Sequence, residues 1–376
     1  MTLAPIDSHL AALLADRPRG PLTHLTSVEW ETILGQASAH GLTFWLQGFP
    51  GLPASLRERV HQECLGTTAR NLALAGELRS LLRALRDEGI RCLPLRGLAL
   101  AERLYGTVPP RPMGDIDLLV RKEDLSQVQA LFRTLGFSEM DRRPGFASAF
   151  SYTFKFFVER SFMVIVEPHW TIAYPPFADR LDMEAVWSRC TRARVVGEET
   201  LSLGREDLLV HLCLHLTHCD DAPFLWLYEL DRYLRQESDA MGWDLVLSVS
   251  CEVGVERLVG YALNEAVAQF GAPVPADVLD ALDGRSGQTR PLAQRLVETS
   301  KVDGVESLAT FFAVKGLGAK FRYARSLLFP QPDFMMLQYG LTHRRQLATT
   351  YARRLCWFSW QAVKGLAHVC FGGAHQ

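Results

Sequence analysis

Two aspartates, Asp115 and Asp117, have the residue type and the spacing of a metal site. They open an apolar run that continues to Val120, which predicts a strand over residues 115–120. Side chains two positions apart on a strand point to the same face of a sheet. Two unpaired carboxylates at the edge of a buried sheet are costly unless a positive charge lies between them. A divalent cation is the usual partner, so the sequence predicts a metal site here.

A third carboxylate, Glu167, lies on a strand predicted further along the chain. Apolar residues alternate over 150–158, a polar turn follows at 159–161, and an apolar stretch returns over 162–170, which together predict a β-hairpin. On the returning strand, Glu167 shares a face with His169. An ionisable residue on an apolar strand needs a partner. Glu167 is therefore a candidate third metal ligand, with a salt bridge to an arginine as the alternative. His169 could contact a substrate or support its neighbours.

The elements that would position these acids alternate between helix and strand. In chain order, the periodicity predicts a helix over 74–89, a strand over 90–95, a turn at Gly97, a helix over 98–105, the acidic strand and a helix over 122–135. This order predicts an α+β fold, in which helices pack on a small mixed β-sheet.

The flanking segments have the pattern of helices. We divide the chain into an N-terminal helical cap (1–75), an α/β core (76–178), a helical domain that completes the cleft (179–300) and basic C-terminal helices (301–376). Helical periodicity is present in residues 8–15, 27–40, 56–75, 205–219, 224–234, 243–270, 305–327 and 342–371. Residues 274–289 have the composition of a Pro/Gly/Asp-rich connector.

Charge is distributed unevenly along the 376 residues. The net charge of −2 gives no overall attraction to nucleic acid. From Lys315 to the end, however, nine Lys or Arg residues accompany one acid, Asp333, so nine minus one gives this segment a charge of +8. Such a segment is usually a solvated face, but it could also bind an acidic acceptor or an anionic lipid surface.

Cysteine usage and the N-terminal residues indicate a cytoplasmic protein. The eight cysteines form no CxxC pair, and we expect reduced thiols. The first residues lack the basic and apolar regions of a signal peptide. No uninterrupted apolar run approaches the roughly 20 residues of a membrane span.

Three motifs together resemble a known superfamily. They are LRGLAL at 95–100 followed by Tyr105, RPMGDIDLLV at 111–120 and VEPHW at 166–170. Their order is a strand, a glycine turn, a helix, an acidic strand and a later strand with a third acid. This order is similar to that of the nucleotidyltransferase superfamily that includes DNA polymerase β. More closely, residues 70–240 resemble a bacterial family of stand-alone nucleotidyltransferases.

The resemblance implies an enzyme that moves a nucleoside monophosphate from an NTP to an acceptor and releases pyrophosphate. Charge builds on phosphate oxygens during in-line attack on the α-phosphate, so positioned cations carry most of the catalysis. Two Mg²⁺ ions, or Mn²⁺, held by Asp115, Asp117 and Glu167 would supply this charge. The two aspartates would contact both ions, and Glu167 would contact the ion on the acceptor side.

The resemblance also indicates where the nucleotide phosphates would bind. Gly97 corresponds to a turn whose backbone N–H groups approach phosphate, but Leu98 follows where the superfamily typically has Ser. Arg96 stands where the closer relatives tend to have Lys, and it keeps the positive charge. The candidate nucleotide-binding and phosphate-binding residues are Arg96, Gly97, Arg111 and His169. Both arginines could instead form structural ion pairs.

A row of histidines has three alternative explanations. His211, His215 and His218 lie at positions i, i+4 and i+7, on one face of a predicted helix. They could bind zinc, line the active-site cleft or pack in the core. Asp231, in the next apolar helix, could likewise face the cleft, or it could bond to Arg232 or to a backbone group.

The sequence supports three functional hypotheses. The first is Mg²⁺-dependent transfer of a nucleotide to a small molecule, a peptide or a protein, which the three carboxylates favour. The second is a toxin-type transferase that modifies RNA such as tRNA, which the basic C-terminal segment favours. The third is a non-catalytic nucleotide-binding partner in a biosynthetic pathway, which Leu98 favours. Because all three acids are present, we rank the hypotheses in this order.

Overall fold

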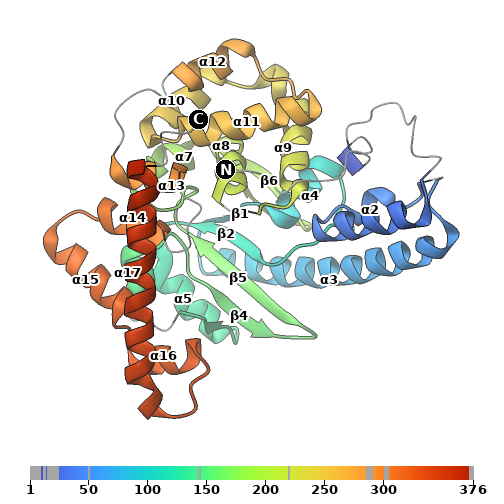
Figure 1. Ribbon diagram of the computed structural model, residues 1–376. Coiled ribbons are helices and arrows are strands. Elements are labelled where there is room, and N and C mark those ends of the chain that lie inside the picture. The colour runs from blue at the N-terminus through green and yellow to red at the C-terminus, as the bar shows by residue number, and fades with distance from the viewer. Residues whose placement is uncertain are drawn as a thin grey trace.

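The computed structural model describes residues 10–11, 14, 25–49, 51–141, 143, 145–218, 221–284, 291–299 and 305–371. A five-stranded mixed sheet lies at the centre, with helices packed around it (Figure 1). The predicted α+β class is therefore confirmed. Most of the helix predicted at 8–15 lies outside the described residues.

The sheet brings together strands that are far apart in the sequence. Its strands are, from one edge to the other, β1 (Cys92–Pro94), β2 (Ile116–Val120), β5 (Met163–His169), β4 (Phe156–Glu159) and β3 (Ser138–Glu139). β2 and β5 run parallel, and the other neighbouring strands run antiparallel. The register of β2 and β5 places Asp117 opposite Glu167 and Leu119 opposite His169. Neighbouring residues in register share a face, so both acids point the same way.

The alternation along β2 decides which face holds the acids. All five residues of β2 are buried, as expected for a strand covered on both faces. Ile116, Leu118 and Val120 pack into one hydrophobic core with helices α3 (Ala54–Asp87) and α5 (Leu125–Thr134). Leu119 packs into a second core with the helices that follow residue 205. Asp117 lies between Ile116 and Leu118 and therefore points to the opposite face from them, toward the helices that follow residue 205.

The helix α3 is continuous where the sequence predicted two helices and a domain boundary at residue 75. It spans 34 residues, from Ala54 to Asp87. Leu74 and Leu78 keep the apolar stripe in phase through the predicted boundary, and no proline interrupts the helix there. It follows α2 (Ser27–Ala39), which Thr26 and Glu29 begin with a capping box, and the short helix η2 (Thr43–Leu46).

The predicted β-hairpin forms, with a shorter first strand. A short helix, α6 (Phe146–Phe150), takes the first residue of the predicted strand, and β4 begins at Phe156. The residues between them remain extended beside β5. The Phe154 N–H donates to the Pro168 carbonyl, and the Trp170 N–H donates to the Tyr152 carbonyl.

The helices after the sheet cover the face that carries Asp117. They are α7 (Met183–Arg189), α8 (Arg205–His218), α9 (Phe224–Glu237), α10 (Trp243–Val253), α11 (Glu256–Phe270) and α12 (Ala276–Gly284). The chain also has the short 3₁₀ helices η3 (Lys122–Asp124), η4 (Ala178–Arg180) and η5 (Ser238–Ala240). The single helix predicted over 243–270 is two helices, because Gly254 adopts a left-handed conformation (φ +80°) between them. The connector predicted at 274–289 contains α12.

Sequence periodicity missed a second hairpin in the region predicted to be mostly helical. It consists of β6 (Thr191–Val195) and β7 (Glu198–Ser202), joined by a tight turn at residues 196–197. Glu198 on this hairpin forms ion pairs with Arg83 (2.7 Å) and Arg86 (3.1 Å) on α3. Polar and apolar residues do not keep a regular alternation across both segments, so the sequence lacks the two-residue period that indicates a strand.

The C-terminal region forms a helical lobe that projects from the rest of the molecule (Figure 1). It follows α13 (Leu292–Thr299) and contains α14 (Val305–Ala313), α15 (Leu317–Leu328), α16 (Pro332–Gln338), η7 (Arg344–Gln346) and α17 (Leu347–Phe371). The helix predicted at 305–327 is interrupted where Gly316 adopts a positive φ of +85°. Among the described residues, no helix combines the length and the apolar character needed to cross a membrane.

Candidate active site

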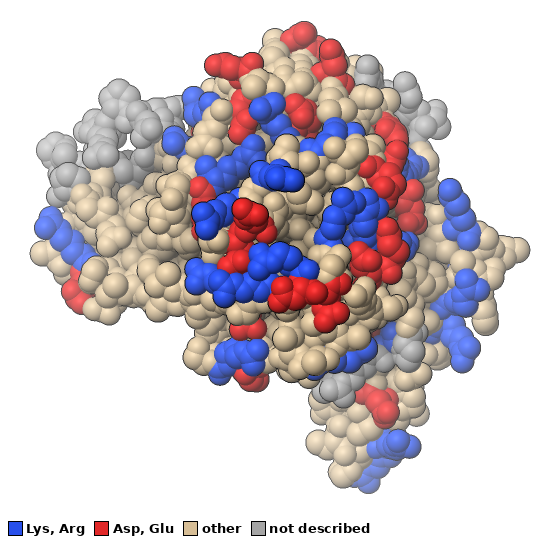
Figure 2. Space-filling view, turned by 180° about the vertical axis from the view of Figure 1, so that it is seen from behind, with Lys and Arg blue, Asp and Glu red and all other residues tan. Residues whose placement is uncertain are grey.

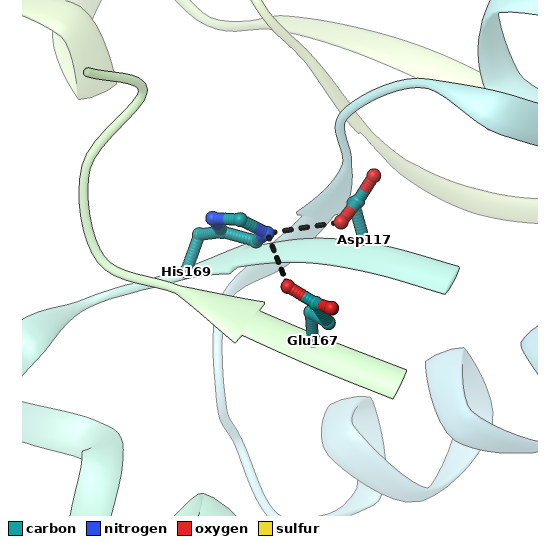
Figure 3. Close-up of side chains that lie close together, drawn as sticks. All are labelled: Asp117, Glu167 and His169. Atoms are coloured by element: carbon teal, nitrogen blue, oxygen red, sulfur yellow. Dashed lines mark hydrogen bonds and ion pairs between the residues drawn. The ribbon is translucent and has the colours of Figure 1, made fainter. Parts of the chain in front are cut away.

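Asp117, Glu167 and His169 form a compact buried group at the centre of the sheet. Figure 3 shows the aspartate on β2 and the other two residues on β5, with the imidazole directed at both carboxylates. His169 Nε2 lies 2.9 Å from Asp117 Oδ1 and 4.0 Å from Glu167 Oε2. One potential ligand atom from each residue lies within 4.8 Å of the others. Two carboxylates and an imidazole at this separation can hold a divalent cation.

Asp115 lies just before this group. Pairing between β2 and β5 begins at Ile116, so Asp115 is in the preceding loop rather than on the predicted strand. It is half-buried and lines the same cavity as the other two acids. Burial and the neighbouring charges of Asp117 and Glu167 raise the pKa of Asp115 to about 6.

Two protein cations neutralise the strand acids. Arg96 donates from Nε (3.1 Å) and Nη2 (2.6 Å) to Asp117 Oδ2. Lys155 Nζ lies 2.7 Å from Glu167 Oε1. Burial by itself raises the pKa of Asp117, but Arg96 and His169 outweigh it and hold that pKa well below its ordinary value. Asp117 is therefore an anion that a second cation could share.

Lys155 is a site residue that the sequence analysis missed. It lies between Phe154 and Phe156 and therefore points to the face opposite these aromatic side chains. A lone cation in an alternating aromatic stretch, directly before the strand β4 that pairs with β5, is the signal that could have identified it.

The turn at Gly97 leads directly into a helix beside the acids. Gly97 has φ +53°, a conformation that favours glycine, and it begins α4 (Gly97–Tyr105). Leu98, found where the superfamily typically has Ser, is buried in the core beneath the sheet. Position 98 therefore offers no side-chain donor to the cavity, and backbone N–H groups at the start of α4 are the groups at this turn that could bind an anion.

Arg111 is bound by a second buried acid. Its Nε lies 2.8 Å from Glu229 Oε1, and both side chains are almost fully buried. Arg111 also donates to the Gly97 carbonyl (3.4 Å), which connects α9 to the start of α4. Both partners line the cavity. Of the two roles that the sequence left open for Arg111, this geometry provides the structural ion pair.

The three histidines of α8 line the cavity, and each ring has its own partner. His211 donates from Nδ1 to the Ile172 carbonyl (2.8 Å), which leaves Nε2 without a proton. His215 lies against Trp226 with ring centroids 3.8 Å apart, and His218 lies 3.2 Å from Glu306.

Burial keeps these histidines neutral. Together with the charge of Arg96, it lowers the pKa of His211 to about 3 and that of His218 to about 4. The same causes lower the pKa of His215 well below its ordinary value. The face of α8 therefore presents uncharged rings to the cavity.

Asp231 lies outside the cavity, whereas Glu229 lines it. Two residues along a helix are separated by about 200°, so Glu229 and Asp231 occupy opposite faces of α9. Asp231 Oδ2 accepts from Arg235 Nε at 2.9 Å, one turn further along the helix. The predicted alternatives for Asp231 were the cleft, Arg232 or a backbone group, and its ion pair in the structure is with Arg235.

These residues surround one cavity of about 600 Å³. The acids and cations line it, the histidines of α8 form one wall, and His40 and Gly41 after α2 also line it. A cavity of this size is typical of small-molecule and cofactor sites. Of the candidate residues from the sequence, all except Asp231 line it: Asp115, Asp117, Glu167, Arg96, Gly97, Arg111, His169, His211 and His215.

Comparisons with known proteins place this cavity in context. The family described as uncharacterised nucleotidyltransferase matches residues 26–271. No curated protein matches the chain. The chain is similar to the solution structure of the antibiotic-resistance factor ANT(2'')-Ia, with 18% identity, a TM-score of 0.34, and coverage of 53% of this chain and 95% of that chain. It is also similar to the crystal structure of ANT(2'')-Ia with adenylyl-2''-tobramycin, with 17% identity, a TM-score of 0.29, and coverage of 57% and 99%.

Proposed function

The chain belongs to the family of uncharacterised nucleotidyltransferases, and from this premise we propose that its cavity transfers a nucleoside monophosphate from an NTP to a small molecule, a peptide or a protein. The observation that carries the proposal is the pairing of Asp117 with Glu167 across two parallel strands, inside a cavity of about 600 Å³. Buried carboxylates in register are costly unless cations accompany them. A transferase of phosphates needs such cations.

The residues present fit a divalent metal. Asp117 and Glu167 offer oxygen atoms, His169 offers Nε2, and Asp115 adds a fourth group beside them. Oxygen-rich sites suit Mg²⁺ and Mn²⁺, which we propose as the cofactor in two copies. When bound, these ions would stabilise charge on the phosphate oxygens and lower the pKa of the acceptor hydroxyl.

Arg96 and Lys155 have a second role in this proposal. A metal ion would compete with Arg96 for Asp117 and with Lys155 for Glu167. The released guanidinium and ammonium groups would then lie beside the cavity without their acids, where the triphosphate is the natural partner. Metal binding and NTP binding would therefore support each other.

The wall of α8 supports an acceptor of low charge. His211, His215 and His218 are neutral at physiological pH, so this wall provides no cation for a polyanionic acceptor. Transfer to tRNA is the second candidate, and the excess of Lys and Arg after residue 315 supports it. A non-catalytic nucleotide-binding role is the third.

Transfer of label from NTPs tests the proposal. The protein is incubated with Mg²⁺ and each of the four α-³²P-labelled NTPs, with small-molecule, peptide, protein and tRNA fractions as separate acceptors. We expect pyrophosphate release and label on one of the first three fractions, and no transfer by Asp117→Asn. Label on tRNA alone would support the second candidate. NTP binding without turnover in every fraction would support the third and overturn the proposal.

A further inference from the structure

The outward face of α17 is apolar, which is unusual for a surface helix. Exposed residues recur at helical spacing and include Trp357, Trp360 and Val363, whose exposed fractions are 43%, 59% and 59%. Grouped exposed apolar side chains mark interaction sites. We call this surface the α17 face, which consists of Ala352, Arg353, Cys356, Trp357, Trp360, Val363 and Lys364.

The opposite side of α17 is already occupied. Gln361 is buried, and a Cβ added at Gly365 would lie 3.0 Å from Val305 Cγ2 on α14, so the two helices are close. The lobe is also fixed to the sheet domain, because the buried Tyr323 stacks on Phe146 of α6 with ring centroids 5.9 Å apart. The α17 face is therefore presented by a helix that is folded and anchored before any partner binds.

Positive charge surrounds this apolar surface. Between Lys315 and residue 371 there are nine Lys or Arg residues and one acid, Asp333. In the view from behind, the lobe at the lower right shows blue and tan atoms with little red (Figure 2). Lys364 lies over the Trp360 ring at 5.3 Å, so cation and aromatic ring share one surface. Contact between two copies of such a surface would bring like charges together, so the partner must be anionic.

A second helix of the lobe has the same character. On α15, Leu317 and Phe321 are 88% and 69% exposed, and they lie one turn apart. Arg322 and Arg325 are exposed on the same helix. Aliphatic side chains such as Leu317 and Val363 cannot stack on nucleic-acid bases, whereas they insert readily among lipid chains. The composition of both helices therefore favours a lipid surface over RNA.

We propose that the C-terminal lobe, residues 305–371, docks this protein on an anionic phospholipid bilayer through the α17 face. Tryptophan rings are stable at the level of the lipid headgroups, and Lys and Arg side chains beside them attract anionic headgroups. One side of α17 packs on α14 and the α17 face runs along the other side, so in this proposal the helix would lie along the membrane surface. The lobe lies outside the residues that match the family, 26–271, so docking is a property added to the transferase domain.

Vesicle co-sedimentation of the full chain tests the docking. The probes are vesicles of phosphatidylglycerol and phosphatidylcholine, compared with vesicles of phosphatidylcholine alone, at low and high salt. We expect binding to the anionic vesicles only, weakened by salt. Trp357→Ala with Trp360→Ala should weaken binding at least about tenfold, because two inserted rings are lost. Arg353→Glu with Lys364→Glu should weaken it at least about 25-fold, because two cations are lost and two anions are added.

Matched controls separate docking from general effects. Leu72→Ala removes an apolar side chain of α3 that is 63% exposed, close to the exposure of Trp360, and should leave binding unchanged. Lys122→Glu with Arg192→Glu makes the same charge change on exposed residues outside the lobe, and should have a smaller effect. Thermal melting verifies that each variant is folded.

Three results would overturn the proposal. They are equal binding to both kinds of vesicle, equal binding by the α17 variants and their controls, and binding to RNA with none to vesicles. A dimer in solution that the tryptophan variant dissociates would instead assign the α17 face to self-association. None of these readouts depends on transferase activity, so docking and the proposed function succeed or fail separately.

Discussion

The cavity and the C-terminal lobe handle charged side chains in opposite ways. In the cavity, each strand acid contacts a protein cation, as in the 2.6 Å contact between Arg96 and Asp117. In the part of the lobe after Lys315, the single acid, Asp333, lies 4.0 Å from Arg344, and both side chains are about 80% exposed. Buried charges must be paired to be tolerated, whereas solvated charges need no partner. In the two proposals above, a ligand of the cavity would replace protein ion pairs, whereas a surface bound by the lobe would supply missing anions.

The largest expected effect is the loss of activity when the paired acid of the cavity is neutralised. Asp117→Asn keeps the size of the side chain but removes the charge that faces Arg96 and any metal. We expect transferase activity to fall on the order of 10³-fold or more, measured as pyrophosphate release. Asp333→Asn makes the same chemical change in the lobe and should leave the activity unaltered. Equal activities of the two variants would contradict the division between the regions.

Breaking the buried ion pair between Arg111 and Glu229 should mainly cost stability. Glu229→Gln leaves the Arg111 guanidinium buried without its acid, so we expect the free energy of unfolding to fall by about 3 kcal/mol in urea titrations. Arg344→Gln breaks the exposed contact with Asp333 and should change it by less than about 0.5 kcal/mol. Similar losses in the two variants would show that burial does not distinguish these pairs.

Lys155→Met tests whether protein cations compete with metal. The Lys155 side chain is 56% exposed, so its ion pair with Glu167 is only partly shielded from water. Its removal should tighten Mn²⁺ binding about fivefold in calorimetry, because Glu167 loses a competitor. The same variant should weaken NTP binding about tenfold, because a phosphate partner is lost. Lys122→Met makes the same change at an exposed lysine outside the cavity, and it is the control against which both affinities of Lys155→Met are compared. Weaker binding of both ligands would contradict the proposed exchange.

The smallest effect is expected for the stability of the lobe. Trp357 and Trp360 point to solvent, so replacing both with Ala should change the free energy of unfolding by less than about 0.5 kcal/mol for each residue. Replacing the buried Tyr323 with Ala should cost about 3 kcal/mol, because it removes a ring packed on Phe146. Thermal and urea unfolding measure both. A large loss from the tryptophan variant would mean that α17 packs against the protein in solution.

The sequence located the acids of the site because local patterns determine them. Asp117 and Glu167 each interrupt an apolar strand, and such an interruption is visible without knowledge of the neighbouring strand. The fold class follows from the order of periodic segments and was predicted correctly. The strand register that pairs the two acids requires the three-dimensional structure.

Other features depend on contacts between distant segments and could not be derived from local patterns. Arg111 and Glu229 are 118 residues apart, and nothing in either segment indicates the other. Whether Glu229 or Asp231 lines the cavity depends on how α9 is rotated about its axis. Because α9 is apolar on both faces, its sequence does not determine that rotation. The β6–β7 hairpin is stabilised by charges on α3, which periodicity does not detect.

The long helix α3 has a consequence for how the protein unfolds. Its first part, with Leu56 and Val60, belongs to the hydrophobic core shared with α8 and α9, and its second part, with Leu78 and Leu82, belongs to the core beneath the sheet. One uninterrupted rod of about 50 Å thus serves both cores. If one core unfolds, α3 is disrupted, and the other core then loses the α3 side chains that pack into it. The two halves of the transferase domain should therefore unfold in a single cooperative transition, and amide hydrogens along the middle of α3 should exchange only through global opening.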